Sequence, residues 1–181
     1  MIDLKQALST ESSRVLIDAV VEHIGSNEKL FEELFHLIFS EKYPLCMRSA
    51  WAAMHACKKN PTLFIPYTND QTIEKALTHP ENGVRRCFLK IFADFAKIEL
   101  LPDCGMLLNF CLNILEKPSE AVANKAYSME IILKICKNEP DLAKEITLLL
   151  QKLMEEEQLP GFTSKANKVI RVLNPSKKQG D

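Results

Sequence analysis

Residues 118–140 read PSEAVANKAYSMEIILKICKNEP, and this stretch predicts one helix held between two prolines. Ser119 is a residue type favoured at helix N-caps, so we expect the helix to begin there. Small and apolar residues then recur at helical spacing, and Lys134 and Lys137 lie near the C-terminal end, where the helix dipole favours cations. Pro140 ends the helix because proline cannot continue one. Versions of this stretch occur four times, so it decides the fold.

The repeat is visible in the prolines. Eight of the nine form two interleaved series, and the members of each series follow one another about 35–45 residues apart. Self-similarity at this period is the signature of stacked helical hairpins. The first series is Pro44, Pro80, Pro118 and Pro160, and the second is Pro61, Pro102, Pro140 and Pro175.

The apolar pattern predicts about ten helices with short connections, paired as antiparallel hairpins. Gly25 to Asn27 should end one helix and cap the next, Asp70 should cap another, and residues 62–69 are expected to be a loop or broken turn. The expected helices lie near residues 2–8, from Ser9-Thr10-Glu11 to Ile24, and near 28–39, 45–58, 70–78, 83–97, 103–116, 119–137, 141–157 and 163–173.

Composition excludes several classes of protein. Hydrophobic residues make up 46% and charged residues 26%, which is ordinary for a soluble folded chain. Only five glycines occur, and neither hairpin-turn dipeptides nor strand-type alternation argue for a sheet. No apolar run approaches the roughly 18 residues needed to span a bilayer. The N-terminus lacks the pattern of a secretory signal, so we expect no membrane association and a cytoplasmic location.

Catalytic and metal-binding motifs are scarce. The six cysteines form no Cys-x-x-Cys pair and lie at no ligand spacing from a histidine, so we expect reduced core thiols, no metal and no cofactor. The sequence has no glycine-rich phosphate loop, no His-Glu-x-x-His and no Gly-x-Ser-x-Gly. His36 and His55 lie in apolar helices and are better explained as core or groove-lining residues than as bases. Enzymatic activity is therefore not favoured, although a repeat scaffold could position isolated groups.

Residues 77–92, LTHPENGVRRCFLKIF, carry the sharpest resemblance to a known family. They resemble a HEAT repeat, in which a proline-containing acidic turn is followed by Val-Arg, a small residue and an apolar stripe. Val84-Arg85 match the pair and Cys87 matches the small position. Residues 43–57 are similar, with Met47-Arg48 and Ala50 at these positions. Later units depart, with Asn124-Lys125 and Ser164-Lys165 where arginine is expected, and the family's turn aspartate is absent.

The resemblance implies an all-α fold, a right-handed α-α superhelix (solenoid) of about four to five helical hairpins of the HEAT/armadillo class. It implies a single domain over residues 1–175, followed by a polar tail at 176–181. The expected units are 1–25, 26–61, 62–102, 103–140 and 141–175.

Charge is distributed unevenly among the expected helices. The second helices of the four units that follow the N-terminal hairpin carry more lysine and arginine than aspartate and glutamate, whereas the first helices and the N-terminal hairpin are acidic and the whole chain has a formal net charge of −1. In HEAT-like solenoids the second helices line the concave surface, so the resemblance implies a basic groove that would steer an acidic partner. The candidate binding residues on this face are Arg48, Trp51, His55, Arg85, Arg86, Lys125, Lys165 and Lys168.

Each of these residues also has a structural interpretation. The cations could complement helix dipoles or form a structural ladder between repeats, and Trp51, Phe88 and Tyr127 could serve packing between repeats. Alternatively, Trp51 could present an edge to the groove beside Arg48 and His55.

Three functions follow from these interpretations. The first is a non-enzymatic interaction scaffold that binds an acidic protein segment in the basic groove. The second is a nucleic-acid-binding protein resembling the HEAT-like DNA alkylation-repair glycosylases, although the pI of about 6.4 is low for that role. The third is an enzyme that acts on a small molecule in the groove.

Overall fold

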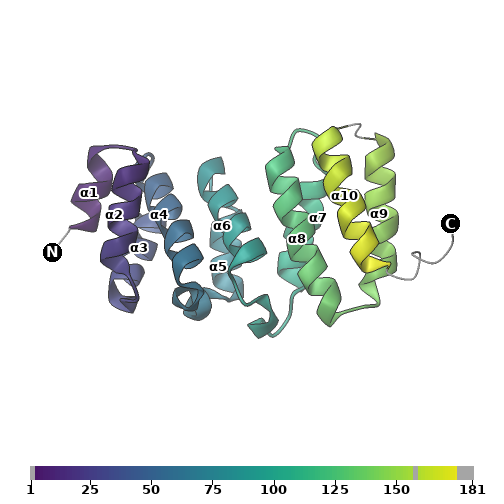
Figure 1. Cartoon of the computed structure of the whole chain (residues 1–181), viewed down its shortest axis with the longest axis horizontal. Coiled ribbons are helices and arrows are strands. Elements are labelled where there is room, and N and C mark those ends of the chain that lie inside the picture. The colour runs from purple at the N-terminus through teal and green to yellow at the C-terminus, as the bar shows by residue number, and fades with distance from the viewer. Residues whose placement is uncertain (1–2, 157–158, 175–181) are drawn as a thin grey trace. The chain divides into compact units, whose positions relative to one another are not determined.

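The computed structural model of the chain describes residues 3–156 and 159–174. Within these ranges every regular element is a helix and no strand occurs, so the predicted all-α class is confirmed. The chain divides into two compact units, residues 1–97 (unit 1) and 98–181 (unit 2), coloured purple to teal and teal to yellow in Figure 1. The division falls inside the third expected repeat. No helix within the described ranges has the length and apolar character needed to cross a membrane.

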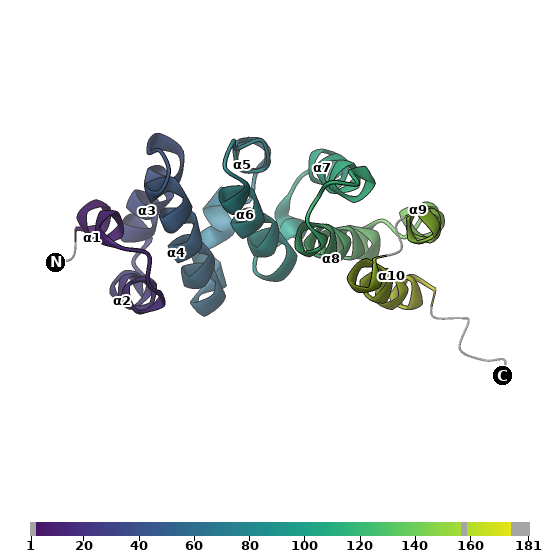
Figure 2. The ribbon, with the colours of Figure 1, turned by 90° about the horizontal axis from the view of Figure 1, so that it is seen from above.

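Unit 1 consists of helical hairpins whose second helices lie side by side. Helix α2 packs against α4, and α4 packs against α6, while α1, α3 and α5 pair with the second helices that follow them. Figure 2 shows α1, α3 and α5 on one side of this unit and α2, α4 and α6 on the other. The elements are α1 (Leu4–Thr10), α2 (Arg14–Ile24), α3 (Glu28–Ser40), α4 (Leu45–Lys59), the 3-10 helix η1 (Pro61–Tyr67), α5 (Asp70–Leu77) and α6 (Asn82–Asp94).

Unit 2 repeats the same arrangement. Helix α7 pairs with α8, α9 pairs with α10, and the second helices α8 and α10 pack against each other. The elements are a short 3-10 helix η2 (Ile98–Leu100), α7 (Gly105–Glu116), α8 (Val122–Asn138), α9 (Leu142–Glu156) and α10 (Pro160–Leu173). The predicted polar tail, 176–181, lies outside the described residues.

Phenylalanines fill the core of unit 1. Phe64, Phe88 and Phe92 are fully buried, and the Phe64 and Phe92 rings meet edge-on with their centroids 5.6 Å apart. Such pairs add stability beyond the area they bury. Phe88 therefore has the packing role expected of it and links α6 to η1 and to α3, where the Phe39 ring centroid is 5.7 Å away.

Several expected helix ends are confirmed. Gly25 ends α2 with a φ of 52°, a conformation that glycine adopts without strain. The Asn27 side chain then caps α3 by accepting hydrogen bonds from the amides of Lys29 (3.1 Å) and Leu30 (3.2 Å). Pro61 begins η1, a 3-10 helix that contains Pro66, where a loop or broken turn was expected over 62–69. Proline at the first position is compatible with a helical turn because its missing N–H would be unpaired there.

Other expected caps were wrong by a few residues. Residues Ser9-Thr10 belong to α1, and Ser13 caps α2 by accepting from the Leu16 amide at 3.1 Å. Asn69, rather than Asp70, caps α5 by accepting from the Thr72 amide at 2.9 Å.

The two late helices and α6 also differ from expectation at their ends. Helix α8 begins at Val122 without a side-chain cap, so Ser119 is no N-cap. The Glu120 carboxylate occupies this turn instead, accepting from the Ala121 amide (3.2 Å) and the Asn124 side chain (2.7 Å). Helix α10 begins at Pro160 and not at 163, and α6 ends at Asp94 and not at 97.

Candidate functional site

Three of the predicted site residues lie on the outward stripe of α4. Arg48, Trp51 and His55 are half-buried and follow one another at three- and four-residue spacing, which places them on one face of the helix. The Trp51 and His55 rings meet edge-on with their centroids 6.0 Å apart. The structure therefore brings together the indole and the imidazole that the sequence suggested as groove-lining groups.

Helix α2 supplies a neighbour that sequence reasoning missed. Nη1 of Arg14 lies 3.0 Å from Nε2 of His55, while Nε of Arg14 lies 2.9 Å from both carboxylate oxygens of Asp18. The hydrogen bond from Arg14 lowers the pKa of the Asp18 carboxyl group. The sequence could have revealed the Arg14–Asp18 pair, because residues four apart meet on a helix surface.

A small cavity of about 270 Å³ opens beside this cluster, between α2 and the C-terminal half of α4. Its charged lining is mixed, since Lys59 forms an ion pair with Glu22 across it and Lys58 is exposed at its edge. The lining residues are Arg14, Asp18, Val21, Glu22, His55, Lys58 and Lys59.

The imidazole of His55 lies in positive surroundings. Burial lowers its pKa, and the positive charges of Arg14, Lys58 and Lys90 lower it further, while Asp18 opposes them. Lys90 belongs to α6, so the three cations come from three helices, and two of them, Arg14 and Lys90, each also form an ion pair with an aspartate of the same helix. An imidazole beside cations is a setting that suits an anionic group, because an incoming negative charge is attracted to the cations.

Arg48 has a structural role that the sequence left open. Its Nη1 donates a 2.9 Å hydrogen bond to the carbonyl oxygen of Leu8 in the last turn of α1. The last carbonyls of a helix lack partners within that helix, so the guanidinium supplies one. Arg48 thereby ties α4 to α1.

The adjacent arginines of α6 differ in their surroundings. Arg85 donates to the carbonyl oxygens of His79 and Pro80 (3.1 Å to the latter) and to the Asn82 side chain, which fastens the turn between α5 and α6. Arg86 is exposed on the surface of α6. Arg85 thus has a structural role within its own repeat, and Arg86 is the arginine of this pair that a partner could reach.

The three predicted site residues of unit 2 also fall into different settings. Lys125 is fully buried, with its Nζ 5.4 Å from the centroid of the Phe162 ring of α10, so the expectation that it lies open on a binding face is corrected. Lys165 of α10 forms an ion pair with Glu130 of α8. Lys168 is exposed on α10.

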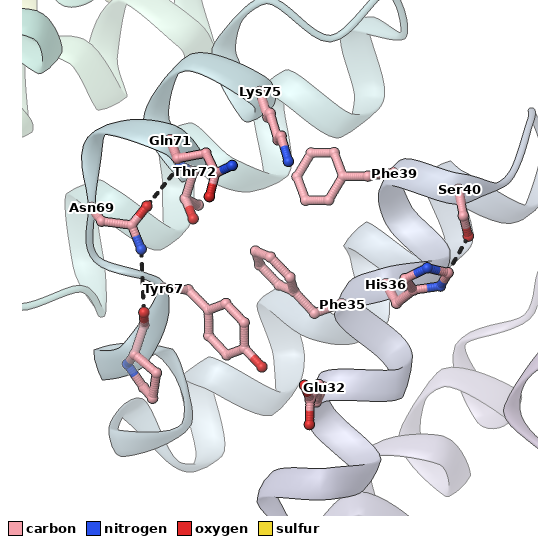
Figure 3. Close-up of a pocket in the computed structure, with 11 residues that line it drawn as sticks. Glu32, Phe35, His36, Phe39, Ser40, Tyr67, Asn69, Gln71, Thr72 and Lys75 are labelled. Atoms are coloured by element: carbon pink, nitrogen blue, oxygen red, sulfur yellow. Dashed lines mark hydrogen bonds between the residues drawn. The ribbon is translucent and has the colours of Figure 1, made fainter.

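A second, larger cavity lies on the other layer of unit 1, between α3, η1 and α5 (Figure 3). Its volume is about 540 Å³. The sequence showed its phenylalanines only as an apolar stripe and placed Tyr67 in a loop. The residues that line it are Glu32, Phe35, His36, Phe39, Ser40, Pro66, Tyr67, Asn69, Gln71, Thr72 and Lys75.

The thiols offer little chemistry. All six cysteines are buried and none forms a disulfide, and burial raises the pKa of Cys87 and Cys111 to about 12. Over residues 3–156 and 159–174, no three His, Cys, Asp or Glu side chains gather in a group that could hold a metal ion. What the described surface offers is charge, aromatic rings and two cavities, which are means of binding.

Comparison with known proteins agrees with this architecture. The family model of the HEAT repeat domain matches residues 4–173, which takes in every helix of both units. No curated protein and no solved structure matches the chain. The matched range and the stacked hairpins confirm the resemblance first seen at residues 77–92, and the chain belongs to the HEAT repeat domain family.

Proposed function

We propose that the chain is a protein-interaction module in which the α4 face of unit 1 binds an acidic segment of a partner protein. We define the α4 face as Trp51, His55 and Lys58 of α4 together with Arg14, which contacts His55 from α2. The observation that carries the proposal is the half-buried Trp51–His55 pair, where Nη1 of Arg14 lies 3.0 Å from the imidazole and Lys58 lines the same cavity. HEAT repeats commonly present such helix faces as binding surfaces.

The chemistry of this face suits a carboxylate flanked by an apolar residue. Lys58 would attract the carboxylate, Arg14 would add the part of its charge that Asp18 does not compensate, and the imidazole of His55 would be a nearby hydrogen-bonding group. Trp51 would offer a large apolar surface to the neighbouring side chain. Tryptophan and arginine are the residue types that most often dominate binding energy at protein interfaces.

The other predicted residues contribute unequally to the proposal. Arg86 and Lys168 are exposed and stay candidates for contact with a partner. Arg48 and Arg85 donate to backbone carbonyls, and Lys165 pairs with Glu130, so part of their charge is already compensated.

A nucleic acid is the second candidate ligand, favoured by the position of Trp51 among cations, where a base could stack. The pI of about 6.4 and the ion pairs Arg14–Asp18 and Lys59–Glu22 argue against a phosphate-binding surface. We therefore rank it below an acidic protein segment.

The experiment uses the full chain and two probes, a blocked peptide of alternating glutamate and leucine and a single-stranded DNA oligonucleotide. Calorimetric titration at low and moderate salt gives the affinity for each. The variant Trp51→Ala/Lys58→Glu should weaken peptide binding by about tenfold or more. Lys144→Glu, an exposed lysine of α9, is the matched control and should leave the affinity unchanged.

Two results would contradict the proposal. One is peptide binding that responds equally to Lys144→Glu and to the α4-face variant, and the other is no binding of the acidic peptide at low salt. Tighter binding of DNA, with an affinity that falls steeply with salt, would favour the second candidate.

A further inference from the structure

The larger cavity of unit 1 has a floor of aromatic rings. The centroids of Phe35 and Tyr67 are 4.0 Å apart with an angle of 32° between the ring planes, and Phe39 lies 5.3 Å from Phe35. These three side chains are half-buried, whereas Phe64 and Phe88 behind them are fully buried. The cavity therefore exposes part of an aromatic cluster whose inner members are held by the core.

One end of the cavity is negative. Glu32 lines it and is exposed, and Figure 3 shows the Tyr67 hydroxyl pointing towards Glu32. Burial raises the pKa of Tyr67, and the charges of Glu32 and Glu28 raise it further. Within the described ranges, neither carboxylate has an ion-pair partner.

The end of the cavity away from Glu32 is polar and carries a positive charge. Lys75 lies beside Phe39 at that end in Figure 3, and Gln71 lies next to it on α5. The Asn69 side chain is already engaged, since it donates to the Pro66 carbonyl at 3.2 Å and accepts from the Thr72 amide at 2.9 Å. Lys75 and Gln71 are donors that a ligand could meet at this end.

This polarity selects one orientation of one kind of ligand. A cation is attracted to the face of an aromatic ring and to a carboxylate, so it would bind at the Glu32 end and avoid Lys75. A carbonyl or carboxylate group of the same ligand would then meet Lys75 and Gln71. An arginine in a peptide has both parts, because its guanidinium stacks flat on rings and pairs with a carboxylate while its backbone offers carbonyl acceptors.

We propose that this pocket binds an arginine side chain of an extended segment of a partner protein, with the guanidinium against the exposed side of the stacked Phe35–Tyr67 pair and beside Glu32. A lysine would be a weaker occupant of the same place. The site lies on the first-helix layer of unit 1 and takes a cation, so it is independent of the α4 face, which takes an anion.

The test is a titration of the isotopically labelled full chain, followed by two-dimensional NMR, with a short blocked peptide that has one arginine between glycines. The expected result is saturable binding, with shifts centred on Phe35, Tyr67 and their neighbours in α3, η1 and α5. The same peptide with citrulline, which keeps the shape and loses the charge, should bind at least about fivefold more weakly.

Two variants test which carboxylate attracts the arginine. Glu32→Gln should weaken arginine-peptide binding by about three- to tenfold, because it removes the carboxylate beside the rings. Glu33→Gln removes the neighbouring exposed carboxylate, which does not line the cavity, and should leave binding unchanged. Both glutamate side chains are exposed, so we expect both variants to keep the fold. The same spectra can check this.

The proposal is overturned by any of four results, three of which concern the affinity. These are no saturable binding of the arginine peptide at millimolar concentration, equal binding of the citrulline peptide, and equal effects of Glu32→Gln and Glu33→Gln. Shifts centred on Trp51 and His55 instead of the pocket would likewise overturn it.

Discussion

Arg48 and Leu8 are joined across unit 1 by a 2.9 Å hydrogen bond from the guanidinium to the backbone carbonyl oxygen. The contact turns a residue that the sequence marked as a partner-binding cation into a brace between α4 and α1. It also separates two kinds of cation on the second helices, those that hold the fold and those that face solvent.

Arg48→Gln should therefore lower the free energy of unfolding by about 1–3 kcal/mol, because a half-buried, charged hydrogen bond is lost and a carbonyl is left without its partner. Arg86→Gln, on the exposed surface of α6, is the control and should change it by less than about 0.5 kcal/mol. Urea denaturation followed by circular dichroism measures both. Equal effects of the two substitutions would contradict the structural role of Arg48.

Helix capping gives a second prediction. Asn27→Ala should destabilise the chain by about 1 kcal/mol, because the amides of Lys29 and Leu30 lose their side-chain acceptor. Ser26→Ala, at the exposed neighbouring position, is the control. The same urea titration compares them, and a Ser26→Ala variant as unstable as Asn27→Ala would show that the cap is placed wrongly.

The third prediction concerns pH. Burial and nearby cations lower the pKa of His55 in the folded chain. As the pH falls through about 6.5, the unfolded chain takes up a proton that the folded chain does not, so stability should fall; above that pH both states are neutral and His55 makes no difference.

The measurement for this prediction is the free energy of unfolding between about pH 7.5 and pH 5.5, a window above the pKa of ordinary carboxyl groups. His55→Gln should make the dependence on pH shallower than in the wild-type chain. Identical slopes for the two proteins would contradict the perturbed surroundings of His55.

The fourth prediction concerns the cysteines. Thiol reagents react with the thiolate, and burial both raises the pKa of Cys87 and Cys111 to about 12 and blocks access. The native chain should react slowly with a disulfide reagent at pH 8, and all six thiols should react rapidly in denaturant. Rapid reaction of all six under native conditions would contradict the buried arrangement.

The sequence predicted the helices well and their ends less well. Apolar periodicity located α3 and α4 to within a residue at each end, because both have a broad buried stripe. Caps were harder, since Ser13 and Asn69 bind amides while the nearby Ser9 and Asp70 do not, and such choices depend on turn geometry that residue type alone does not determine.

The site was predicted in part. Trp51 and His55, which the sequence suggested as neighbours, lie on one face because both belong to one helix. Arg14, which comes from another helix, and the hydrogen bond of Arg48 to Leu8 depend on packing between elements distant in sequence. Burial of Lys125 was missed because lysine is rarely buried, and the Phe162 ring that lies beside it belongs to a different repeat.

Trp51 is the only tryptophan of the chain and lies within unit 1. Its emission is therefore an intrinsic optical reporter of that unit alone, while unit 2 is silent at wavelengths that excite only indole. Comparing the midpoint seen by indole emission with the midpoint seen by total helicity would show whether the two halves of the protein melt together or in turn.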